Sequence, residues 1–111
     1  MKSTYLALFV GLAAMLSACR MQDVRTIRIS VPAMRNPACT EVVRVALSKL
    51  QGVMGERTRF DLKRHTVTVS YDSLLLSLKN VEFAIADAGF AADEVPANTN
   101  AVAALPPECC R

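Results

Sequence analysis

Residues 27–52 read IRISVPAMRNPACTEVVRVALSKLQG, and the spacing of apolar residues changes partway along this stretch. In its first part, Ile27, Ile29 and Val31 alternate with polar residues, which is the period of a half-buried strand. The proline that follows cannot donate a backbone hydrogen bond and is typical of a strand end. We therefore predict a strand over 24–31.

In the second part of the stretch, apolar residues recur at intervals of three and four, the spacing of one face of an amphipathic helix. They are Val42, Val43, Ala46, Leu47 and Leu50. Gly52 can end this helix, because glycine readily adopts the left-handed conformation that follows many helices. We predict the helix over 38–50.

The chain continues with the pattern of a hairpin, a second helix and a short strand. Alternating residues predict strands over 57–62 and 66–71, Ser77 can cap a helix that ends at Gly89, and a last strand follows over 90–95. The order β-α-β-β-α-β predicts an α+β, ferredoxin-like sandwich, in which a four-stranded antiparallel sheet carries both helices on one face. Many unrelated functions use this architecture, so the fold alone does not define one.

The first residues resemble the leader of a bacterial lipoprotein. Lys2 precedes an apolar run that ends in Leu16-Ser17-Ala18-Cys19, a sequence similar to a lipobox. The resemblance implies a lipoprotein signal peptide over 1–18, lipid on the Cys19 thiol and a short tether over 19–24. An ordinary cleaved secretory signal is the alternative, since the apolar run is shorter than the roughly 20 residues that cross a bilayer. We expect a protein of the bacterial cell envelope, lipid-anchored at the periplasmic or outer-membrane face.

Charge and composition argue against two broad classes of function. The net charge of +3 is small, and the basic residues are interleaved with acidic and apolar ones, so a nucleic-acid partner is not indicated. The acidic residues are scattered singly, the one histidine has no neighbouring nucleophile, and no glycine-rich phosphate loop is present. We expect a protein that is not an enzyme.

Residues 25–95 resemble a heavy-metal-associated domain, the module of periplasmic mercury-binding proteins, copper chaperones and the amino-terminal extensions of metal-pumping ATPases. The resemblance covers nearly the whole chain between the tether and the tail. It is carried by Ile29-Ser30-Val31 before a loop that contains methionine, by Val42-Val43-Arg44-Val45-Ala46-Leu47, and by Ile85-Ala86-Asp87-Ala88-Gly89-Phe90.

The chain departs from that family at the metal-binding loop. The family motif is usually Gly-Met-Thr-Cys-x-x-Cys, whereas this chain has Ala33-Met34-Arg35-Asn36-Pro37-Ala38-Cys39. Asn36 replaces the first cysteine, and an amide oxygen is a poor ligand for soft ions, so a Cys-x-x-Cys site is excluded.

Cys39 is the cysteine of the motif that remains, and it stands where the predicted helix begins. Backbone N–H groups and the helix dipole there favour a thiolate over a thiol; a small buried apolar residue is the alternative. The resemblance implies that Met34 packs inward beneath the loop and that Phe90 shields the site, which makes Met34, Asn36 and Phe90 possible secondary site residues. The turn residue His65 is expected to be solvated.

The tail, residues 96–111, ends in Cys109 and Cys110 and is predicted to be extended. An extended chain spans about 3.3 Å per residue, so the tail is long enough to return to the helix start. The leading hypothesis is a soft-metal site for Cu(I), Hg(II), Cd(II) or Zn(II), formed by Cys39 with one or both tail cysteines. Such a protein would capture metal or hand it to a metal transporter or efflux component.

A disulfide between Cys39 and either Cys109 or Cys110 is the alternative, because nearby cysteines outside the cytoplasm tend to be oxidised. It would define a structural or redox-active lipoprotein. Once Cys19 carries lipid, three thiols remain and one bridge leaves one of them unpaired.

Overall fold

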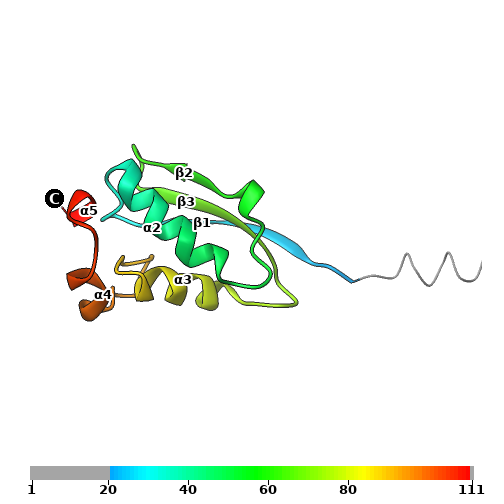
Figure 1. The fold of residues 1–111 in the computed structure, drawn as a ribbon. Helices are drawn as coiled ribbons and strands as arrows, with labels where there is room; N and C mark the ends of the chain where they lie inside the picture. The colour runs from blue at the N-terminus through cyan, green and yellow to red at the C-terminus, as the bar shows by residue number, and fades with distance from the viewer. Residues whose placement is uncertain (1–20, 111) are drawn as a thin grey trace, which may run out of the picture.

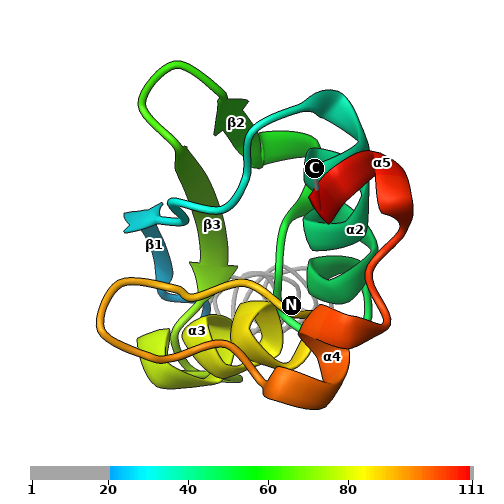
Figure 2. The same cartoon turned by 90° about the vertical axis from the view of Figure 1, so that its left-hand side faces the viewer.

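The computed structural model describes residues 21–110, with side chains up to Cys109. The elements, in chain order, are β1 (Val24–Ser30), α2 (Pro37–Ser48), the short 3-10 turn η1 (Gly55–Arg57), β2 (Arg59–Asp61), β3 (Thr66–Asp72), α3 (Leu78–Asp87), α4 (Thr99–Ala103) and α5 (Pro107–Cys110). Figure 1 shows the two long helices running along the sheet, and Figure 2 shows them on one face of it. The predicted order from the first strand to the second helix is therefore confirmed. None of the helices in the described range is long and apolar enough to span a bilayer.

The sheet has three antiparallel strands in the order β1-β3-β2. Its register pairs Ile29 with Val67 and Phe60 with Val67, so alternate residues of each strand share a face. The face toward the helices supplies the apolar core, while Arg28 and Arg59 flank Thr68 on the opposite face. The first strand and the hairpin thus follow the period of two that the sequence shows.

The predicted fourth strand over 90–95 is not formed. Ala92 and Val95 hydrogen-bond to each other across a tight turn, and Asp93 has a positive φ of 51°. This turn hydrogen-bonds to the sheet at Ser30, where the Asp93 N–H donates to the Ser30 carbonyl at 2.8 Å and the Ser30 N–H donates to the Asp93 carboxylate at 2.9 Å. A side-chain oxygen thus takes the place of a strand carbonyl, and the pairing ends there.

Both long helices begin at a side-chain cap and are followed by a glycine. Asn36 caps α2, with Pro37 as its first residue, and Ser77 forms a capping box with Asn80 at the start of α3. Gly52 and Gly89 follow the two helices with φ values of 107° and 108°, a region that glycine alone adopts without strain. The cap predicted at Ser77 and the helix end predicted at Gly89 are confirmed.

The tail is not extended as predicted but forms the two short helices α4 and α5. The Asn98 side chain caps α4 by accepting hydrogen bonds from the backbone N–H groups of Asn100 and Ala101. The Asn98 N–H donates to the Ala86 carbonyl of α3 at 2.9 Å. Alanine is the strongest helix former, so an asparagine cap followed by an alanine-rich run favours a helix over an extended chain. Figure 1 shows both tail helices at the end of the domain where α2 begins.

The core lies between the sheet and the two long helices and extends to the tail. Its fully buried members come from β1, the loop after it, α2, β3, α3 and the segment after α3: Ile29, Val31, Met34, Cys39, Val43, Val67, Val69, Val81, Ile85, Phe90 and Ala92. Cys109 is also buried and belongs to the same cluster, and the half-buried Leu105 packs against this cluster. The tail therefore contributes to the core.

Candidate thiol site

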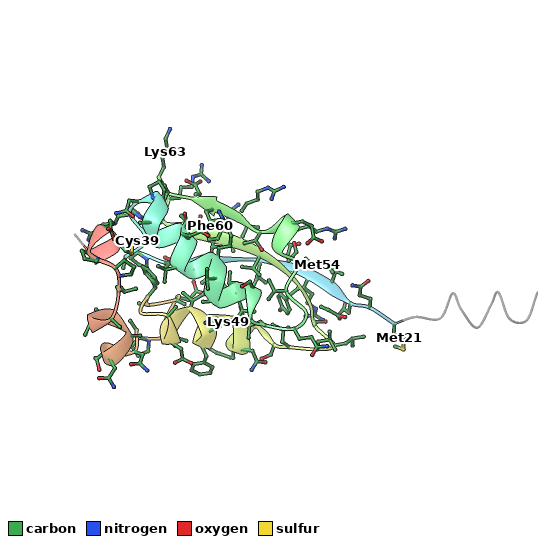
Figure 3. All side chains as sticks on the ribbon, viewed as in Figure 1. Met21, Cys39, Lys49, Met54, Phe60 and Lys63 are labelled. Atoms are coloured by element: carbon green, nitrogen blue, oxygen red, sulfur yellow. A yellow bond between two sulfur atoms is a disulfide. The ribbon has the colours of Figure 1, made fainter. Side chains whose placement is uncertain are left out.

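Two cysteines far apart in sequence meet at the start of α2. Cys39 is the third residue of the helix and has no exposed surface, and Cys109 lies in α5 with 5% of its surface exposed. The two sulfurs form a disulfide with the Cα atoms 4.8 Å apart. Figure 3 shows Cys39 at the end of α2 that faces the tail, far from Met21. Of the three predicted thiol ligands, two are therefore together, joined as in the alternative hypothesis.

Cys19 and Cys110 complete the predicted set of cysteines, and neither can be placed at the site. Cys19, like the predicted signal peptide, lies outside the described residues. Cys110 closes α5, directly after the bridged Cys109, but its side chain lies outside the description.

Asn36 connects the helix start to the tail. Its side-chain oxygen accepts a hydrogen bond from the Cys39 backbone N–H at 3.0 Å, and its amide nitrogen donates to the Glu108 carbonyl at 2.6 Å. The amide thus uses both its donor and its acceptor to hold α2 and α5 together. Asn36, which stands where the family has its first cysteine, thus holds the backbone next to each of the two bridged cysteines.

Met34 and Phe90 lie beneath the site and are fully buried. The Met34 N–H donates to the Val31 carbonyl at 3.0 Å, and its carbonyl lies 2.9 Å from His65 Nδ1. These bonds fix the loop between β1 and α2.

His65 is not the freely solvated residue that we expected. It is half-buried with a positive φ of 53°, its ring contacts the Met34 carbonyl, and its own carbonyl accepts from the Val31 N–H at 2.7 Å. Its side chain and backbone therefore hold the loop that precedes α2, which a lone turn histidine in the sequence did not indicate.

A pocket of about 350 Å³ opens beside the disulfide. The loop after β1 contributes Ala33 and Arg35, and the tail contributes Leu105 and Cys109, with Phe90 between them. The tail therefore covers the helix start without filling the space next to Cys109.

The bridged sulfurs are not available as metal ligands, because thiolates rather than disulfides bind soft ions. Within the part of the chain whose side chains are described, no group of three or more His, Cys, Asp or Glu residues could hold a metal. Metal binding at Cys39 and Cys109 therefore requires reduction of the bridge. Sequence reasoning allowed both the bridge and the ligand pair, and the tail helices that it missed determine which cysteine reaches Cys39.

Residues 28–91 match the family model of the heavy-metal-associated domain, and the chain belongs to this family. The match ends before α4, so the tail and Cys109 lie outside it. No match was found among curated proteins.

Solved structures of metal-binding proteins share the fold. Oxidized MerP from Ralstonia metallidurans CH34 is 30% identical with a TM-score of 0.59, and the alignment covers 64% of this chain and 96% of MerP. A copper-binding domain from a P-type ATPase is also 30% identical, with a TM-score of 0.58 and coverage of 62% and 90%. The CopZ metallochaperone is 25% identical, with a TM-score of 0.57 and coverage of 61% and 98%. The chain is thus similar to proteins that bind soft metals.

Proposed function

We propose that this protein is a membrane-anchored binder of a soft metal ion, which it captures or hands on through Cys39 and the C-terminal cysteines. The observation that carries the proposal is the pair of Cys39 and Cys109 sulfurs at the start of α2, in the loop-to-helix position of the family's metal motif. The amide of Asn36 would otherwise leave a single thiol there. The tail supplies a second sulfur from outside the family match.

The disulfide corresponds to the oxidised, metal-free form of such a site. A dithiol reductant would transfer two electrons and two protons to the bridge, becoming a disulfide itself and leaving thiols at Cys39 and Cys109. Loss of the thiol protons then gives two thiolates that can share one ion, at a metal–sulfur distance of about 2.3 Å for zinc. The start of α2 favours the charged form of Cys39, and Cys110 is the adjacent candidate for a third ligand.

Transfer of the ion fits the geometry of a site made from two segments. Cys39 is held in a helix, whereas Cys109 belongs to a four-residue helix at the chain end. A partner thiolate could replace Cys109 first and Cys39 second, so the ion would never be free in solution. The partner class is a metal transporter or efflux component, in keeping with the P-type ATPase domain and metallochaperone among the structural neighbours.

Titration of the reduced protein with Cu(I) or Hg(II) tests the proposal. We expect the reduced protein to retain one ion per chain against a competing ligand, and Cys39→Ser, Cys109→Ser and the oxidised protein, in which Cys110 is the remaining thiol, to lose it. Cys110→Ser separates a two-thiolate from a three-thiolate site, and Glu56→Gln on the exposed η1 turn is the matched control. Unchanged stoichiometry in Cys39→Ser would overturn the proposal.

The buried bridge also supports a second candidate, a structural or redox-active lipoprotein. The disulfide joins α2 to a tail that is further held by the Asn36 to Glu108 hydrogen bond and by the packing of Leu105. A stable structural bridge would resist reduction by a dithiol and leave one free thiol per lipidated chain. Thiol counting across a series of redox buffers, with metal retention measured in parallel, distinguishes the two candidates.

A further inference from the structure

The turn between β3 and α3 presents leucines to solvent at the end of the domain opposite the disulfide. In this leucine turn, defined as residues 73–77, Leu74 is 54% exposed and Leu75 is 58% exposed. Figure 1 shows the turn at the far end of α3 from the tail helices. Single exposed leucines are ordinary, but two adjacent ones on an ordered turn form a small apolar patch that is accessible for contact.

The leucine turn is held rigidly by the domain behind it. The backbone N–H groups of Leu75 and Leu76 donate to the Asp72 carbonyl at 3.0 and 3.2 Å, and the Leu74 N–H donates to the Asp72 carboxylate at 3.0 Å. Leu76 is buried and packs directly on Gly52, so a side chain at position 52 would overlap the Leu76 side chain. The turn therefore keeps Leu74 and Leu75 exposed in its folded conformation.

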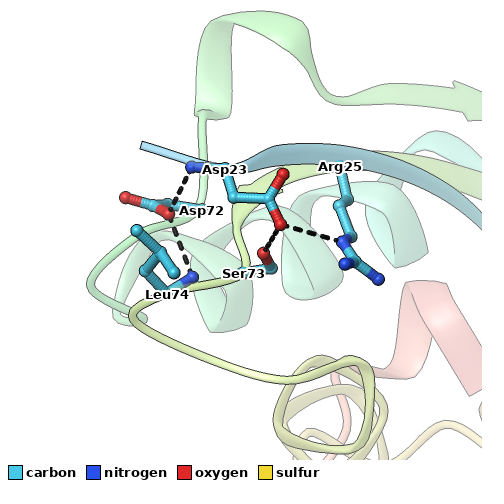
Figure 4. Close-up of polar contacts among 5 residues, drawn as sticks. All are labelled: Asp23, Arg25, Asp72, Ser73 and Leu74. Atoms are coloured by element: carbon cyan, nitrogen blue, oxygen red, sulfur yellow. Dashed lines mark hydrogen bonds and ion pairs between the residues drawn. The ribbon is translucent and has the colours of Figure 1, made fainter. Parts of the chain in front are cut away.

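Asp23, just before β1, is bound directly to this turn, as Figure 4 shows. The Ser73 N–H donates to the Asp23 carbonyl at 2.8 Å, the Asp23 N–H donates to the Asp72 carboxylate at 3.2 Å, and the Ser73 hydroxyl donates to the Asp23 carboxylate. That carboxylate also pairs with Arg25 at 3.2 Å, which compensates its charge. The chain thus leaves the domain beside the leucine turn.

The chain leading to the predicted lipid anchor is short and carries one apolar side chain, Met21, between Arg20 and Gln22. Met21 is 84% exposed, and Cys19 precedes Asp23 by four positions, which an extended chain spans in about 14 Å. A lipid on Cys19 would therefore hold the bilayer surface next to Leu74 and Leu75. Because the anchor already holds the domain at the membrane, binding of the turn costs little further entropy, and a small apolar patch then suffices for contact.

We propose that the leucine turn inserts into the membrane surface that holds the Cys19 lipid, so that the domain stands with its disulfide end away from the bilayer. The inserting groups are Leu74 and Leu75, together with Met21. This inference rests on the lipid anchor in the proposed function, but it does not depend on metal binding. Its consequence is that Cys39 and Cys109 face a partner approaching from the aqueous side.

The absence of tryptophan from the chain allows a direct test. Leu75→Trp and Leu74→Trp place a reporter on the turn, and Phe83→Trp, at a side chain 52% exposed on α3, is the matched control. Each full-length lipidated protein is reconstituted into phosphatidylethanolamine and phosphatidylglycerol vesicles, with or without bromine on the acyl chains. We expect bromolipid to quench the indole at positions 74 and 75 about twofold or more, with a blue-shifted emission, and to leave the control unaffected.

Flotation of the same vesicles separates failure of the anchor from failure of the turn. Protein that floats while bromolipid quenches neither turn position, or quenches the control equally, would overturn the insertion and leave the anchor standing; a protein partner for the turn is then indicated. Protein that neither floats nor carries diacylglycerol on Cys19 would overturn the anchor and the insertion together. Metal titration of the same samples reports on the thiol site independently.

Discussion

Replacement of Asn36 by alanine should reveal how much the tail contributes to the stability of the thiol site. The side chain makes two hydrogen bonds, one from the Cys39 N–H as the cap of α2 and one to the Glu108 carbonyl of α5. Loss of an asparagine cap costs about 1 kcal/mol, and loss of the second hydrogen bond costs about another 1 kcal/mol. We expect Asn36→Ala to lower the free energy of unfolding by about 2 kcal/mol.

Thermal unfolding followed by circular dichroism, without reductant, measures this effect. For a domain of this size about 2 kcal/mol corresponds to a decrease in Tm of roughly 10 °C. Ser77→Ala is the matched control, because Ser77 caps α3 in the same way but has no bond to the tail among the hydrogen bonds of the described residues. It should lower the free energy of unfolding by about 1 kcal/mol.

Removal of residues 106–111 separates the two contributions. In the shortened chain Glu108 is absent, so Asn36→Ala should cost only the cap, about 1 kcal/mol, while Ser77→Ala should cost the same as before. If Asn36→Ala has an equal effect in both chains, the Glu108 hydrogen bond does not stabilise the docked tail and the reasoning is refuted.

Three further predictions concern the disulfide, the thiol pair of the family motif and the carboxylate of Asp23. The disulfide joins residues separated by 70 positions, so Cys109→Ser should lower the free energy of unfolding by up to about 4 kcal/mol. Chemical denaturation checks this: adding reductant should lower the free energy of unfolding of the wild-type protein to that of the variant. Asn36→Cys in a chain without residues 106–111 restores the family's thiol pair, so it should retain one Cu(I) per chain after dialysis, while the same chain with Asn36 intact should lose it. The hydrogen bond from Ser73 and, to a smaller extent, Arg25 hold the pKa of Asp23 below its ordinary value. Because the folded pKa is the lower one, the stabilisation is present above the unfolded pKa and is lost as pH falls through the folded pKa, and Asp23→Asn should flatten that part of the acid unfolding curve.

Much of the domain could be predicted because its elements follow simple periods. The alternation at Ile27 and Ile29, the apolar stripe of α2 and the Ser77 cap each depend on residues close together in sequence. The prediction of a fourth strand was wrong because the deciding contact joins residues far apart in sequence. The run from Phe90 to Val95 has an apolar pattern typical of a strand, but Asp93 bonds to Ser30 of β1 through its side chain and turns the chain away.

The thiol site was harder to predict because its geometry depends on tail docking. Cys109 and Cys110 are equivalent by reach, and the odd number of thiols favoured a three-thiol metal site or a reversible redox cycle over a purely structural bridge. Cys109 rather than Cys110 is bridged to Cys39 because α5 docks beside the start of α2. The Asn98 cap, the glycine at position 89 and the packing of Leu105 bring the tail to that place. A side chain at Gly89 would lie 3.1 Å from the Ala101 carbonyl, a tight contact, and Gly89 has a φ of 108°, so glycine at this position favours the close approach of α4 to α3.

The exchange of a cysteine for Asn36 and the presence of Cys109 can be understood as one change. A thiol at position 36 would pair with Cys39 from the same loop and would need no tail. An asparagine there loses the ligand but binds the Glu108 carbonyl, one residue before the sulfur that takes its place. Because this bond and the packing of Leu105 do not depend on the disulfide, they should keep Cys109 near Cys39 after reduction. The reduced protein would then present a preorganised pair of thiols to an incoming ion, and ordering the chain end would not oppose metal binding.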